Sequence, residues 1–94
     1  MAGNDFYSAM LKVCTYFEHV NKEESVHFVD GDAQFVNNVA EICHLMREKE
    51  YSRETIMQVH DILCDFIFLI ATDEAWFYLD KLNKTFRRFF PKLF

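Results

Sequence analysis

Large apolar residues recur every three or four positions through most of this chain, the spacing that places them on one face of an α-helix. One such stretch fades by Lys22, and a second runs from about Asp32 to Glu48. The apolar stripes are Phe6, Met10, Val13, Phe17 and Val20 in the first, and Phe35, Val39, Ile42, Cys43 and Met46 in the second. The pattern therefore predicts one helix in each stretch.

Residues 25–32 are predicted to connect these helices, with a short extended piece at 26–29. Gly31 is a turn residue, and Asp32 is of the type that caps a helix start. The acidic residues here do not form a calcium-binding EF-hand loop, because Phe35 and its neighbours follow in place of alternating oxygen ligands. A turn followed by a cap accounts for the segment.

Ser52 is the strongest predicted helix start in the chain, because its hydroxyl can accept a hydrogen bond from a free amide of the first turn. The helix that follows runs to about Ala71 and is apolar around most of its circumference. Its polar strip consists of Glu54, Gln58, Asp61, Asp65 and Thr72, interrupted by Leu69. Helices of this kind are usually enclosed by others, so we predict that this third helix is the central element.

Thr72, Asp73 and Glu74 have the composition of a new helix start, which predicts a separate fourth helix. One long bent helix stays open, because neither Gly nor Pro marks the junction. The fourth helix should end before Pro91, which cannot continue the backbone hydrogen bonding. Its apolar stripe is Ala75, Leu79, Leu82, Phe86, Phe89 and Phe90. We therefore predict one all-α domain over residues 1–94, a compact bundle of about four roughly antiparallel helices.

Composition agrees with this fold and bounds the function. The chain has 94 residues, enough for one core, and its two Gly and one Pro are too few for a turn-rich β-sandwich. The net charge is −5, yet residues 81–94 hold five bases and no acid. An acidic protein should not bind nucleic acid through its whole surface, so the basic C-terminal end is a separate question.

The chain is predicted to be a soluble cytoplasmic protein. Its first residues lack the charged and apolar regions of a secretory signal, and its most apolar window, 56–71, falls short of the ~20 apolar residues that span a membrane. Cys14, Cys43 and Cys64 are odd in number and lie in apolar helical patterns. This usage favours reduced core thiols over a disulfide framework.

Two pairs of residues invite chemical interpretations. His60 and Cys64 stand four apart, a spacing that can supply two zinc ligands, but we favour a core thiol beside a histidine. Asp61 and Asp65 form a carboxylate pair that we interpret as a solvated helix face, because no nucleophile, phosphate-binding loop or oxyanion elbow accompanies it. We predict no catalytic residue, metal site or cofactor.

The fourth helix carries the candidate partner-binding residues, called here the basic strip. Helical spacing places Phe77, Lys81, Lys84 and Arg88 on one face, and Arg87 is included as a steering charge beside Arg88. At about 100° per residue, Phe77 falls opposite the core stripe and among cations, which is typical of a recognition surface. A plainer interpretation is equally open: Phe77 lies over the stems of Lys81 and Lys84, or contacts a second copy.

This strip permits three kinds of partner. It could follow a nucleic-acid backbone, although one exposed ring and no known motif favour that poorly. Binding to an anionic membrane surface would also use large apolar side chains that the core requires first. They are Trp76, Phe89, Phe90, Leu93 and Phe94. Docking on an acidic protein surface is the simplest use, with Arg87 and Arg88 steering the encounter.

The first and third helices and the segment 91–94 carry more apolar surface than one bundle requires. We therefore expect a small non-enzymatic interaction protein: an inhibitor, adaptor or immunity-type binder that occupies a partner protein's surface. A homodimer is another way to cover the surplus. The alternative function is a nucleic-acid-associated regulator that uses the basic C-terminal helix.

Overall fold

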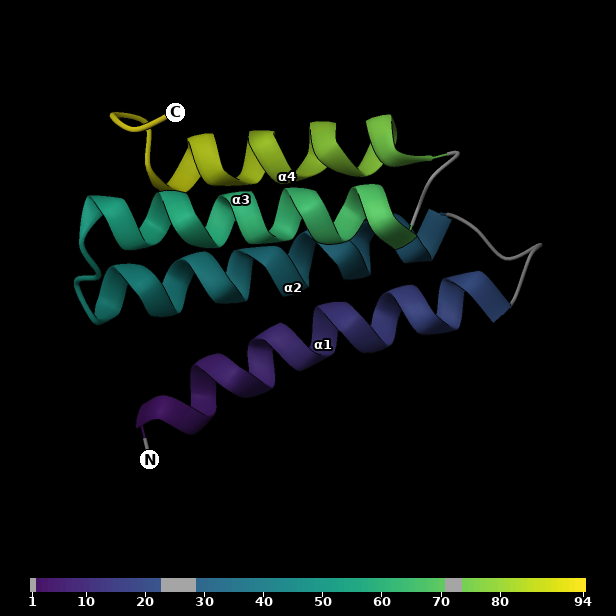
Figure 1. Cartoon of the computed structure of the whole chain (residues 1–94), viewed down its shortest axis with the longest axis horizontal. Helices are drawn as coiled ribbons and strands as arrows, with labels where there is room; N and C mark the ends of the chain where they lie inside the picture. The colour runs from purple at the N-terminus through teal and green to yellow at the C-terminus, as the bar shows by residue number, and fades with distance from the viewer. Residues whose placement is uncertain (1, 23–28, 71–73) are drawn as a thin grey trace.

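The computed structural model describes residues 2–22, 29–70 and 74–94, and the side chains of residues 7–17, 33–70 and 74–94. Over these residues the chain forms four helices and no strand. They are α1 (Ala2–Lys22), α2 (Val29–Glu48), α3 (Arg53–Ile70) and α4 (Ala75–Phe89). Consecutive helices run in opposite directions (Figure 1). The predicted all-α bundle is confirmed.

The second helix begins earlier than the sequence pattern predicts. It starts at Val29, so Gly31 and Asp32 lie in its first turn rather than in a turn before it. Of the extended piece predicted at 26–29, Val29 is helical and the rest lies outside the described residues.

The third helix begins at the predicted cap. Ser52 directly precedes it, and the backbone N–H of Thr55 donates to Ser52 Oγ at 3.2 Å. The hydroxyls of Ser52 and Thr55 are 2.8 Å apart. The side chain of Ser52 therefore satisfies one of the amides that a helix start leaves free.

Replacing Ser52 by alanine is expected to lower the free energy of unfolding by about 1 kcal/mol, because the Thr55 amide loses its acceptor. Urea unfolding followed by circular dichroism measures the change. Ser52→Asp keeps an acceptor and should unfold close to wild type. Equal losses in the two variants would show that the hydroxyl is not acting as a cap.

The third and fourth helices are separate, which excludes the single bent helix. α3 ends at Ile70, α4 begins at Ala75, and the two run antiparallel (Figure 1). The predicted start residues Thr72 and Asp73 lie outside the described residues. α4 ends before Pro91 as predicted, with the Phe90 N–H donating to the Phe86 carbonyl at 2.8 Å.

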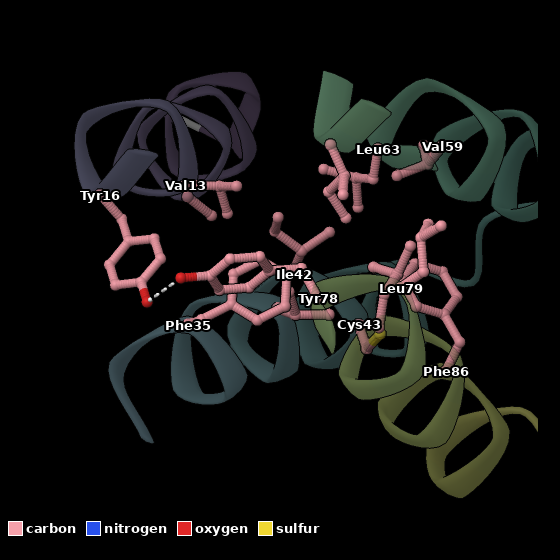
Figure 2. Close-up of a cluster of buried hydrophobic side chains, with 14 of the residues drawn as sticks. Val13, Tyr16, Phe35, Ile42, Cys43, Val59, Leu63, Tyr78, Leu79 and Phe86 are labelled. Carbon is pink, nitrogen blue, oxygen red and sulfur yellow. Dashed lines mark hydrogen bonds between the residues drawn. The ribbon is translucent and has the colours of Figure 1, made fainter. Parts of the chain in front are cut away.

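The core confirms the apolar stripes of α2 and α4. Every predicted α2 position, from Phe35 to Met46, has no exposed surface. Four of the six positions on α4 are buried, and Phe89 and Phe90 are partly buried against the core. Side chains from all four helices meet in this space, as Figure 2 shows.

Aromatic rings hold one end of the core together. The rings of Phe17, Phe35 and Tyr78 lie edge-to-face, with centroids 5.1–5.5 Å apart. The hydroxyls of Tyr16 and Tyr78 are 3.3 Å apart and form a buried hydrogen bond between α1 and α4 (Figure 2). This cluster therefore joins three helices at one point.

The prediction that the third helix is central is wrong. α2 packs against both α1 and α4, whereas the close backbone contacts of α3 are with α4. The outer face of α3 is exposed at Met57, Ile62, Phe68 and Leu69. α3 buries Ile56, Val59, Leu63 and Ile67 on one side, and no helix in the described part of the chain covers the opposite side.

Candidate protein interaction surface

The predicted basic strip lies along the outer side of α4. Phe77 is 42% exposed, and the Lys81 ammonium lies over its ring, 5.4 Å from the centroid. The Phe77 ring also meets the ring of Tyr78 edge-on, with centroids 5.3 Å apart. Phe77 is thus partly covered within the chain, as the plainer interpretation of the strip proposed.

Other cations of the strip also have partners within the chain. Lys84 pairs with Asp80 one turn away at 3.1 Å, so an acid interrupts the predicted run of bases. The Arg88 guanidinium lies 5.3 Å from the Phe89 ring, and Arg47 of α2 approaches the same ring at 5.7 Å. The strip is therefore less available to an acidic partner than its sequence indicates.

Arg87 lies apart from the other members of the strip. At 100° per residue it falls with Trp76, Asp80 and Asn83, on the side of α4 that faces α3. It is exposed and makes no ion pair within the described part of the chain. The structure thus brings Phe77, Lys81, Lys84 and Arg88 together and separates Arg87 from them.

A second surface lies on α3 and α4. Surplus apolar surface was predicted for the third helix, but its extension to Trp76 was not. We call this surface the apolar patch; it consists of Met57, Ile62, Phe68 and Leu69 of α3 and Trp76 of α4. Leu69 is 75% exposed and Trp76 is 81% exposed. Trp76 was predicted to belong to the core, and this prediction is wrong. The other four side chains that were predicted to belong to the core do pack against it. They are Phe89, Phe90, Leu93 and Phe94.

A hydrogen bond between α3 and α4 fixes how the patch is assembled. His60 Nε2 lies 2.7 Å from Asn83 Oδ1. Because the helices are antiparallel, equal steps from this pair place Trp76 at the level of Ile67 and Phe68. The exposed rings of Phe68 and Trp76 therefore belong to the same end of the α3–α4 pair.

Two carboxylates divide the α3 part of the patch. Helical spacing places Asp61 and Asp65 between Met57 and Phe68 on one side and Ile62 and Leu69 on the other. Both acids are exposed, as the sequence predicted for a solvated face. Asp61 Oδ1 lies 3.9 Å from His60 Nδ1, and Asp65 has no ion-pair partner among the described residues.

The thiols report the electrostatics of these helices. Burial, followed by the charges of Asp61 and Asp65, raises the pKa of the half-buried Cys64. Burial also raises the pKa of Cys43 to about 12, an effect that the charge of Arg88 opposes. All three cysteines are free, and Cys14 and Cys64 are only partly buried. At Cys64 the two carboxylates thus add to the effect of burial.

The candidate metal pair remains a thiol beside a histidine. Cys64 Sγ lies 3.8 Å from His60 Nδ1 and 3.9 Å from Nε2, while Nε2 faces Asn83. The His60 ring packs against Phe86 and Phe94. Within residues 7–17, 33–70 and 74–94, no three His, Cys, Asp or Glu side chains gather in a metal-binding arrangement.

Comparison with known proteins gives no match: no family model fits the chain, and no curated protein or solved structure is significantly similar to it. None of the helices in the described part of the chain combines the length and hydropathy needed to cross a membrane.

Proposed function

We propose that this protein is a small non-enzymatic interaction module that occupies the surface of another protein, as inhibitors and adaptors do. The observation that carries the proposal is the apolar patch. Five large apolar side chains are exposed along two packed helices, and two of them, Leu69 and Trp76, are largely in solvent. Large apolar side chains exposed in this number on two neighbouring helices are typical of docking sites.

The energetics of association favour this use of the patch. Fully burying a side chain such as Phe or Leu is worth roughly 1.5–3 kcal/mol, and exposed Trp is enriched among the residues that dominate interfaces. Phe68 and Trp76 lie at one end of the pair and can anchor a partner together. The basic strip on the outer side of α4 then supplies charged groups at the edge of this surface.

The test is capture of a partner from lysate of the source cells on the immobilised protein. The variant Phe68→Ser/Leu69→Ser/Trp76→Ser is expected to retain at least tenfold less of the captured protein, because each change removes an exposed anchor. Its fold should be unaffected, since the three side chains are exposed. Circular dichroism and quantitative mass spectrometry provide the two readouts.

Tyr7→Ser/Leu11→Ser is the matched control, because it removes exposed apolar side chains from α1 instead. Capture should survive in this control. The proposal is contradicted if the Phe68→Ser/Leu69→Ser/Trp76→Ser variant still captures the partner, or if the control loses capture to the same degree.

The same protein separates this function from that of a nucleic-acid-associated regulator. A salt-graded DNA and RNA binding assay would reveal such a regulator as binding that weakens steeply with salt and is lost in Lys84→Glu/Arg88→Glu. The ion pair of Lys84 with Asp80 leads us to expect no such binding.

A further inference from the structure

The outer face of α3 combines apolar side chains with carboxylates in a fixed order. We call it the α3 face; its members are Met57, Asp61, Ile62, Asp65, Phe68 and Leu69. Met57 and Leu69 are twelve residues apart, which is about 18 Å along a helix. A partner helix of three to four turns has the length to cover this face.

The two carboxylates lack compensation from the chain itself. Asp61 and Asp65 are one turn apart, a spacing at which like charges destabilise a helix. Together with burial, both charges raise the pKa of the neighbouring Cys64, so they act on the same small region. A partner whose cations lie beside Asp61 and Asp65 would offset the repulsion between the two carboxylates.

The same charges argue against a second copy on this face. Two α3 faces brought together would oppose carboxylates with carboxylates, which costs binding energy at an interface. The basic strip of a second copy is also a poor match, because Lys84 pairs with Asp80, Lys81 lies over Phe77 and Arg88 lies over Phe89. Arg87 makes no ion pair among the described residues, but a single cation cannot match two carboxylates one turn apart.

We propose that the α3 face binds a basic amphipathic helix of a partner protein. This helix carries apolar residues at i, i+3 or i+4 and i+7, which pack on the two apolar rows. Lys or Arg residues one turn apart then meet Asp61 and Asp65. The net charge of −5 steers such a helix toward the protein. This inference rests on the proposed function and names the chemistry of its partner.

The test uses two synthetic amphipathic peptides of about four turns. They share a leucine seam and differ only in two positions one turn apart, which are Lys in one peptide and Glu in the other. Fluorescence anisotropy at low salt is expected to show at least tenfold tighter binding of the Lys peptide. In Asp61→Lys/Asp65→Lys this preference should reverse in favour of the Glu peptide.

Glu48→Lys/Glu50→Lys is the matched control, because it changes the net charge equally but lies at the turn between α2 and α3. It should keep the preference for the Lys peptide. Binding of neither peptide, equal binding of both, or the same reversal in the control would overturn the inference. Light scattering that shows dimers lost in Asp61→Lys/Asp65→Lys would overturn it in favour of a second copy.

The outcome is distinguishable from failure of the proposed function. If the protein captures a partner through Phe68, Leu69 and Trp76 but does not prefer the Lys peptide, the interaction module stands and the basic helix is wrong. If the Lys peptide binds as expected but no protein is captured from the lysate, the α3 face prefers basic helices and the proposed interaction module is wrong.

Discussion

Replacing Phe35 by alanine is expected to lower the free energy of unfolding by about 3–5 kcal/mol. The side chain has no exposed surface, and its ring contacts those of Phe17 and Tyr78 at centroid distances of 5.5 and 5.1 Å. Alanine would remove the α2 ring of a cluster that joins α1, α2 and α4. The cavity left behind adds to the lost burial, because close-packed neighbours collapse only in part.

A loss of this size is a large fraction of the roughly 5–15 kcal/mol that stabilises a typical domain. The melting temperature should fall by roughly 15–30 °C, and urea unfolding would give the free energy directly. Phe68→Ala makes the same chemical change on the exposed outer side of α3, and it should stay within about 0.5 kcal/mol of wild type. Similar losses at the two positions would show that Phe35 is not in a packed core.

The helices most faithfully predicted from the sequence are those with one apolar stripe. In α2 the stripe from Phe35 to Met46 is flanked by polar residues, so the 3.6-residue period alone identifies the buried side. In α4 the same argument placed Leu82 and Phe86 in the core. Helical spacing also anticipated the contact between Phe77 and Lys81, since residues four apart are neighbours on a helix.

Periodicity failed where a helix is apolar on more than one side. In α3 the pattern does not distinguish a helix enclosed by neighbours from one with an apolar outer face, because both carry the same residues. The interruption of its polar strip by Leu69 was the available signal for the second case. Trp76 was ambiguous for a related reason: it lies at the edge of the α4 stripe, about a quarter turn from its centre.

The sequence also left open what covers the apolar residues after Pro91. The structure answers within the chain: Leu93 and Phe94 are partly buried against the core, and their amides donate to the Phe90 carbonyl at 3.0 and 3.2 Å. The Phe94 ring lies 4.7 Å from the His60 ring and 5.4 Å from the Phe86 ring. This segment closes the end of the core between α3 and α4.

Leu93→Ala/Phe94→Ala is therefore expected to lower the free energy of unfolding by about 2–4 kcal/mol, less than full burial of both side chains would give. Urea unfolding measures the loss. Lys92→Ala lies in the same turn with an exposed side chain, and it should be close to neutral. The double variant should also expose the His60 and Phe86 rings to solvent, which increases binding of a dye for apolar surface.

The loss in free energy of unfolding shows whether Leu93 and Phe94 belong to the core or to a binding surface. A loss above about 2 kcal/mol means that Leu93 and Phe94 belong to the folded core, as half-buried large side chains should. Partner binding would then depend on the apolar patch, whose members cost little stability when replaced. A loss below about 0.5 kcal/mol would instead mark Leu93 and Phe94 as spare apolar surface. The docking surface would then extend from Met57 across the end of α4.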